Sequence, residues 1–122
     1  MAKILIADIE PDVNDAMKDM FESMGNTVYT ANSKDEAINA IRKYKPDIVS
    51  IDVREKPYWN MRLDVLKKIK EIDKNIKIFV VTTFDANIRE DEAQIRAIGV
   101  EDCMEKPIDM TKFAEKLKEV KL

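Results

Sequence analysis

Short apolar runs alternate with segments of helical periodicity along the whole chain. Five runs are the expected strands, and each is followed by a segment whose apolar residues recur every three or four positions. The expected strands are residues 3–7, 27–31, 47–52, 76–82 and 100–104. Strict alternation of strand and helix predicts a parallel sheet with helices on both faces. We therefore expect an α/β fold, formed by one domain over residues 1–122.

Capping signals indicate where the expected helices begin and end. Pro11 suits the first turn of the first helix, and Gly25 follows the apolar stripe of that helix. Ser33 and Glu36 form a capping box at the start of the second helix. Asp109 is a suitable N-cap for the last helix. These signals support the alternation that the apolar pattern indicates.

The composition excludes several kinds of site. The chain has no histidine, one cysteine and two glycines. This excludes histidine-based triads and metal sites, multi-cysteine zinc sites and glycine-rich phosphate loops. The 21 basic and 24 acidic residues give a net charge of −3, which argues against direct binding to nucleic acid or to a membrane surface. Because no apolar stretch approaches the roughly 20 residues of a membrane span, we expect a cytoplasmic protein.

Polar residues stand at or just past the ends of four expected strands. They are Asp8, Asp52, Thr82 and Lys106. The carboxyl ends of parallel strands meet at one edge of a sheet, where ligands bind. Carboxylates bind a hard cation, and lysine and threonine can contact a phosphoryl oxygen. The sequence therefore predicts that these side chains converge and that the site carries out phosphoryl chemistry on a carboxylate.

Four segments carry a resemblance to a known family. They are KILIADIEPDV, PDIVSIDV, FVVTT and IGVEDCMEKPID, in this order. Together they make the chain resemble the response-regulator receiver domain, the phosphorylation module of two-component systems. The resemblance covers the whole chain and implies a flavodoxin-like (βα)5 domain with strand order 2-1-3-4-5. It also implies a phosphorelay receiver whose partners are a histidine kinase or phosphotransfer protein and an output protein.

The resemblance implies a role for each residue of the expected site. Asp52 matches the aspartate that accepts the phosphoryl group, and Lys106 matches the lysine that contacts this group. Thr82 matches the switch hydroxyl. Asp8 matches the first member of an acidic pair that holds magnesium, with Asp52 as a further ligand, and Arg54 matches a position whose backbone carbonyl binds the metal. The implied activity is phosphoryl acceptance with slow self-dephosphorylation, and no conventional enzyme reaction.

The resemblance also implies how a signal leaves the domain. The switch hydroxyl moves toward the phosphoryl group, and the fourth helix, fifth strand and fifth helix then change their exposed face. In this chain that face spans about residues 85–122. In addition, the family holds the bond that matches Lys106–Pro107 in the cis form.

Three features depart from the family pattern. Ile9 stands where the second acid of the pair is usual, although the next residue, Glu10, is a candidate metal ligand. The loop after Asp52 is about two residues longer than usual, and Cys103 replaces the switch aromatic residue. A missing carboxylate is expected to weaken magnesium binding about 10- to 100-fold. Two functions remain open: a phosphorylatable receiver, or a pseudo-receiver that binds partners without phosphorylation.

Several of these residues also have simpler structural explanations. Asp8 and Lys106 could form only a structural ion pair, and the carboxylate nearest Lys106 should have a lowered pKa. Cys103 is expected to be a small buried hydrophobic residue rather than a redox sensor. Tyr58 and Trp59, in the long loop, could either cover the domain as a lid or anchor a partner.

Overall fold

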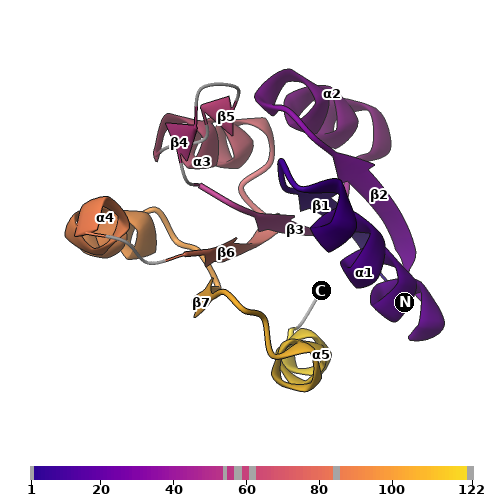
Figure 1. The fold of residues 1–122 in the computed structure, drawn as a ribbon. Helices are drawn as coiled ribbons and strands as arrows, with labels where there is room; N and C mark the ends of the chain where they lie inside the picture. The colour runs from indigo at the N-terminus through magenta and orange to yellow at the C-terminus, as the bar shows by residue number, and fades with distance from the viewer. Residues whose placement is uncertain (1, 54, 57–58, 61–62, 84–85, 121–122) are drawn as a thin grey trace.

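Five parallel strands form the central sheet of the protein (Figure 1). The structure is a computed structural model that describes residues 2–53, 55–56, 59–60, 63–83 and 86–120. The strands of the sheet lie in the order β2-β1-β3-β6-β7, which is the predicted order 2-1-3-4-5 when these five strands alone are counted. Their bounds are β1 Lys3–Ala7, β2 Thr27–Ala31, β3 Ile48–Ile51, β6 Lys77–Thr82 and β7 Asp102–Glu105.

Helices cover both faces of this sheet, as the alternation predicts. Their bounds are α1 Pro11–Ser23, α2 Lys34–Tyr44, α3 Leu63–Ile72, α4 Ala86–Ala97 and α5 Met110–Glu119. Figure 1 shows α1 and α5 on one face and α2, α3 and α4 on the other. The flavodoxin-like fold class is therefore confirmed. None of the helices in the described part of the chain is both long and apolar enough to cross a membrane.

The two hydrophobic layers follow from the alternation of side chains along each strand. In β1, Ile4 and Ile6 pack toward α1 and α5, whereas Leu5 and Ala7 pack toward the helices of the other face. All four are buried. Strands that are buried on both faces read as continuous apolar runs, which is why these runs could be recognised.

Three phenylalanine rings hold α1 and α5 against the sheet. The Phe113 ring lies 5.2 Å from Phe21 in an edge-on arrangement and 5.3 Å from Phe79, between ring centroids. Such pairs add about 0.5–1.5 kcal/mol beyond the area that they bury. The first and the last helix of the chain are thereby fixed to the same face of the sheet.

The predicted helix caps are formed, with one difference. Ser33 Oγ accepts a hydrogen bond from the Glu36 N–H, whereas the Glu36 carboxylate accepts from the N–H of Asn32 rather than from Ser33. Asp109 accepts from the Lys112 N–H at the start of α5.

Two parts of the strand pattern differ from the prediction. Strand β7 begins at Asp102, two residues later than expected, because pairing with β6 starts at Phe79 and Asp102. The segment after Asp52, expected as a loop, contains a two-stranded antiparallel hairpin, β4 Glu55–Lys56 and β5 Trp59–Asn60. Strands of two residues are too short to produce a recognisable alternation.

Candidate functional site

Four polar residues meet at the carboxyl edge of the sheet. Asp8 follows β1, Asp52 follows β3, Thr82 ends β6, and Lys106 follows β7. Because these strands are neighbours in the sheet, the four positions become adjacent. The side chains of Asp8, Asp52 and Thr82 are buried, with 3%, 1% and 0% of each residue exposed. The predicted convergence of the four residues is confirmed.

The Lys106 ammonium bridges the two carboxylates. Its Nζ lies 2.6 Å from Asp8 Oδ2 and 2.9 Å from Asp52 Oδ2. The backbone N–H of Lys106 donates to the Thr82 carbonyl at 2.9 Å, which ties the segment after β7 to the end of β6. The Lys106–Pro107 peptide bond is cis, as predicted.

Both oxygens of the Asp52 carboxylate accept hydrogen bonds. The Thr82 hydroxyl donates to Oδ1 at 2.7 Å, and Lys106 occupies Oδ2. The Asp52 backbone N–H also donates to the Ala7 carbonyl at 3.1 Å. The orientation of this carboxylate is therefore determined by a hydroxyl on one side and a cation on the other. These are two groups that can stabilise negative charge on an incoming ligand.

Burial decides the direction of the pKa shift at Asp8. The carboxylate accepts from Lys106 and from the Glu10 N–H at 2.9 Å, and both bonds favour its ionised form. Burial disfavours that form more strongly and raises the pKa of Asp8. The expectation of a lowered pKa for the carboxylate nearest Lys106 is thus wrong, because sequence reasoning weighed the neighbouring charge and not the loss of water.

The pKa of Lys106 moves in the direction that its partners favour. Burial disfavours the ammonium form, but the hydrogen bonds to Asp8 and Asp52 outweigh this effect and raise the pKa of Lys106. The lysine is therefore a permanent cation in this site, and its position depends on the two carboxylates.

Asn14 is a site residue that the sequence analysis did not identify. It lies on α1, is 2% exposed, and donates from Nδ2 to the carbonyls of Asp8 at 3.0 Å and Ala31 at 3.3 Å. Its Oδ1 is buried and has no hydrogen-bond partner among the described residues. Asn14 holds the ends of β1 and β2 to α1 and so fixes the backbone at Asp8. The available signal was a polar residue between Val13 and Met17 on an otherwise apolar stripe.

Comparison with known proteins identifies the family. The family model "Response regulator receiver domain" matches residues 4–118. The chain belongs to this family. The polar-differentiation response regulator DivK of Brucella anthropi is 32% identical over 104 residues, which cover 83% of this chain and 80% of DivK. Sporulation initiation phosphotransferase F of Bacillus subtilis is 24% identical over 95% of this chain and 90% of its own.

Solved structures share the fold of this receiver domain. The CheY-like response regulator receiver domain protein of Methanospirillum hungatei superposes with a TM-score of 0.88 and 22% identity, over 98% of this chain and 92% of that protein. The similarity at this identity concerns the fold. The family match and the two relatives named above place the chain among the proteins of two-component signalling.

The residues of this receiver domain fit magnesium only in part. Asp8 and Asp52 are two carboxylates at one place, and magnesium is commonly held by one or two carboxylates together with water. However, the Lys106 ammonium lies between them, and no group of three acidic or cysteine side chains that could hold a metal occurs in the described part of the chain. Asp8 and Asp52 would therefore hold the metal once Lys106 has moved away.

The other predicted metal ligands do not complete this set. Ile9, at the position of the usual second acid, is partly buried and packs against the core on the α2, α3 and α4 face. Glu10 lines a hollow beside Pro107, and within the described residues it does not form a three-acid group with the two aspartates. Arg54 lies outside the described residues, so the role of its carbonyl stays a prediction.

The two other departures from the family pattern are Cys103 and the longer loop after Asp52. Cys103 is partly buried against the hydrophobic core, and burial raises the pKa of its thiol. Both properties agree with a small hydrophobic residue rather than a reactive thiolate. Tyr58 and the side chain of Trp59 lie outside the described part of the structure, so the two roles considered for them stay predictions.

Proposed function

We propose that Asp52 of this receiver domain accepts a phosphoryl group from a histidine kinase or a phosphotransfer protein. The supporting observation is the pair of donors on its carboxylate, the Thr82 hydroxyl on one oxygen and the Lys106 ammonium on the other. Phosphoryl transfer requires mainly a positioned nucleophile and charges that stabilise the transferring oxygens. Asp52, Thr82 and Lys106 supply these functions at one place.

In the proposed transfer, an Asp52 oxygen attacks the phosphorus atom of a phosphohistidine on the donor protein. The oxygen–phosphorus bond forms as the phosphorus–nitrogen bond breaks, and the electron pair of the broken bond stays on the imidazole. Lys106 exchanges its contact with Asp52 for one with a phosphoryl oxygen. The Thr82 hydroxyl donates a hydrogen bond to another phosphoryl oxygen and keeps its proton. Magnesium held by Asp8 and Asp52 would supply further neutralising charge beside the phosphoryl group.

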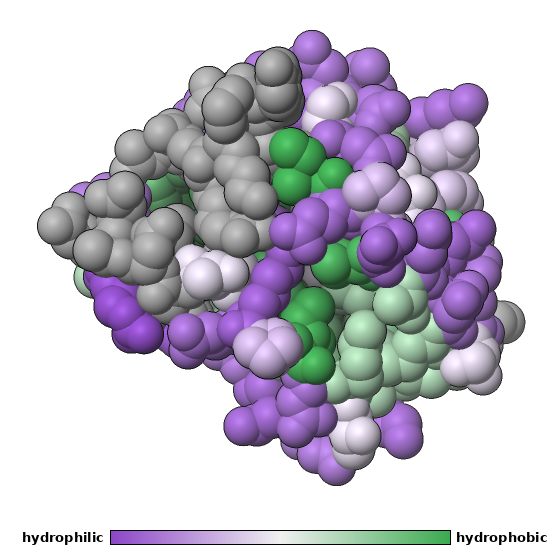
Figure 2. Space-filling model, in the orientation of Figure 1, coloured by the Kyte–Doolittle hydropathy of each residue, from purple (hydrophilic) through white to green (hydrophobic). Residues whose placement is uncertain are grey.

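A hollow beside the site suits the donor protein. It has a volume of about 550 Å³ and extends from α1 to the segment between β7 and α5. Figure 2 shows hydrophobic surface in this region, and the apolar lining residues are Val13, Ala16, Pro107, Ile108 and Met110. Because Lys106 lines the same hollow, a partner seated there would lie directly next to the Asp52 site. The donor protein is therefore the occupant that we assign to it.

The signal leaves the domain through α4, β7 and α5 toward an output protein. Thr82 pairs with Glu105 in the sheet, so a displacement of Thr82 acts on β7 directly. Within β7, Asp102 accepts a hydrogen bond from Lys116 of α5 and lies 3.6 Å from a guanidinium nitrogen of Arg96 in α4. These ion pairs join the three elements into one surface.

A specific observation also supports the second function, a pseudo-receiver. Lys106 contacts both carboxylates in the place where a metal ion would bind, and Ile9 packs against the core where the family has an acid. In a pseudo-receiver, the cluster of Lys106 with Asp8 and Asp52 would stabilise the fold. The protein would then bind its partners without phosphorylation.

One experiment separates the two functions. The protein is incubated with acetyl phosphate and magnesium, and its intact mass is measured. Phosphorylation adds the mass of one phosphoryl group, which Asp52→Asn abolishes. The matched control is Asp19→Asn, an exposed aspartate on α1 outside the hollow, which should leave the gain unchanged. Absence of any mass gain in the parent chain would favour the pseudo-receiver.

A further inference from the structure

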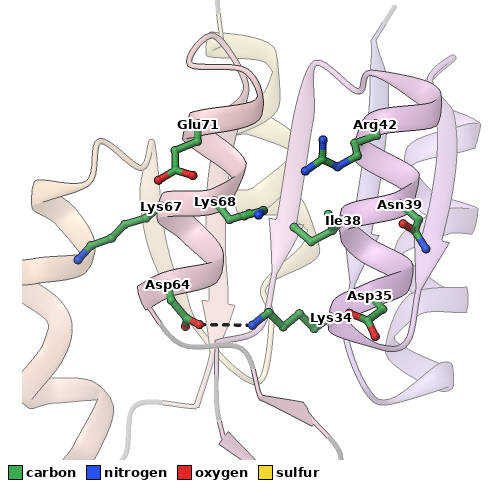
Figure 3. Close-up of a pocket in the computed structure, with 9 residues that line it drawn as sticks. All are labelled: Lys34, Asp35, Ile38, Asn39, Arg42, Asp64, Lys67, Lys68 and Glu71. Carbon is green, nitrogen blue, oxygen red and sulfur yellow. Dashed lines mark hydrogen bonds and ion pairs between the residues drawn. The ribbon is translucent and has the colours of Figure 1, made fainter.

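A second hollow lies between α2 and α3, away from the Asp52 site (Figure 3). Its volume is about 650 Å³, within the range of small-molecule sites. It is independent of the phosphorylation proposed above. The residues that line it are mostly charged: Lys34, Asp35, Ile38, Asn39, Arg42, Asp64, Lys67, Lys68 and Glu71.

Two cations converge in the middle of this groove. Figure 3 shows Arg42 of α2 and Lys68 of α3 extending from opposite helices into the space between them, and Ile38 of α2 points into the same space. Neither side chain forms an ion pair or hydrogen bond within the described part of the chain. Two like charges that face each other repel, and an anion placed between them is attracted by both.

The acidic side chains of the groove leave Arg42 and Lys68 available to bind an anion. The carboxylate of Asp64 is paired with Lys34 across the groove at 3.3 Å, which joins the first turns of α2 and α3. Glu71 and Asp35 remain as acceptors along the lining. They would repel a partner segment with several acids, but they can accept hydrogen bonds from the hydroxyl groups of a small ligand.

We propose that the α2–α3 groove binds a small phosphate monoester of the sugar-phosphate class. The phosphate lies between Arg42 and Lys68, since a guanidinium and an ammonium are the usual protein groups for phosphate oxygens. The carbon skeleton lies over Ile38, and the hydroxyl groups face the Glu71 carboxylate on the α3 side of the lining. Among the residues that the structure describes, the lining contains no aromatic side chain on which a nucleobase could stack.

The chain provides a matched control for this proposal. Lys67 and Lys68 are neighbours on α3, but Figure 3 shows the Lys67 ammonium extending away from α2. Replacing either lysine by glutamine changes the net charge equally. Only Lys68→Gln removes a cation from the middle of the groove.

The test is a titration of the ¹⁵N-labelled protein with glycerol 3-phosphate, followed by amide chemical shifts. The Asp52→Asn chain is used so that changes at the other site do not interfere. We expect saturable shifts along α2 and α3, weakened about tenfold by Arg42→Gln and by Lys68→Gln. Lys67→Gln should retain nearly the parent affinity. Circular dichroism confirms that each variant is folded.

Three results would overturn the proposal. Shifts that do not saturate, or that avoid α2 and α3, would show that the groove is not a binding site. An equal effect of Lys67→Gln and Lys68→Gln would show general charge attraction only. Inorganic phosphate that binds as tightly as glycerol 3-phosphate would overturn the assignment of a hydroxyl-bearing ligand.

Discussion

The Lys106 ammonium lies 2.6 Å from Asp8 Oδ2, at a place where both side chains are largely removed from water. The same nitrogen contacts Asp52, so one cation compensates two buried carboxylates. The Lys106 ammonium therefore occupies the space between the two carboxylates. Binding of a metal ion by both acids, or of a phosphoryl group by Lys106, therefore requires the lysine to move, and its contacts oppose that movement.

Removing the ammonium should destabilise the protein. In Lys106→Met the apolar stem remains, but two buried carboxylates lose their cation. We expect a loss of about 3 kcal/mol in the free energy of unfolding near neutral pH, measured by urea denaturation. The matched control is Lys112→Met, an exposed lysine on α5, with an expected change within about 0.5 kcal/mol. Similar losses in both variants would contradict the compensating role of Lys106.

Restoring the usual second acid should strengthen magnesium binding. Ile9→Asp adds a carboxylate next to Asp8, and we expect the magnesium affinity to rise about 10- to 100-fold. Without metal the variant should be less stable, because an apolar side chain packed on the core is lost and a like charge is added. A magnesium titration by isothermal calorimetry measures the affinity.

Glu10→Gln is the control for this substitution. If Glu10 already replaces the missing acid, Glu10→Gln should abolish magnesium binding in the parent chain and Ile9→Asp should add little. If neither Ile9→Asp nor the parent chain responds to magnesium, the site has lost metal binding for other reasons, and the pseudo-receiver becomes the better explanation.

Much of the fold and the convergence of the site could be predicted from the sequence. Buried parallel strands read as apolar runs, and the polar residue that ends each run lies at the same edge of the sheet. Asp8, Asp52, Thr82 and Lys106 were found in this way, and the order of the strands followed from the family resemblance.

Other features depend on burial and on contacts between distant segments, which cannot be seen in the sequence alone. The raised pKa of Asp8 results from burial exceeding the attraction of Lys106, and the degree of burial is known only from the packed structure. The role of Asn14 depends on two carbonyls from different strands. The hairpin of β4 and β5 has strands too short for a periodic signal.

Asn14 should be important for stability because of its amide group. Asn14→Asp keeps the shape of the side chain but replaces the donor by an oxygen that faces the carbonyls of Asp8 and Ala31. We expect a loss of about 3 kcal/mol near neutral pH, compared with about 1–2 kcal/mol for Asn14→Ala. Urea denaturation measures both. The reverse change at the exposed neighbour, Asp15→Asn, should alter stability by less than about 0.5 kcal/mol. If Asn14→Ala and Asn14→Asp lose the same free energy of unfolding, the oxygen that Asn14→Asp places opposite the two carbonyls has no effect of its own.

The ion pairs of Asp102 should make part of the stability depend on pH. Burial raises the pKa of Asp102, but the hydrogen bonds from Lys116 and the Cys103 N–H, with the charge of Arg96, outweigh burial and hold this pKa below its usual value. The folded state therefore binds the Asp102 proton more weakly than the unfolded state does. The contribution to stability is present above the unfolded pKa and is lost as the pH falls through the folded pKa.

Asp102→Asn tests this dependence. We expect the variant to be about 1 kcal/mol less stable than the parent near pH 7. The difference should shrink as the pH falls from about 5 to about 2, because the parent carboxylate then becomes neutral as well. Urea denaturation of both proteins across this range measures the difference, with Asp19→Asn, an exposed aspartate on α1, as the control. A difference that stays constant with pH would mean that Asp102 stabilises α4, β7 and α5 by packing and not by its charge.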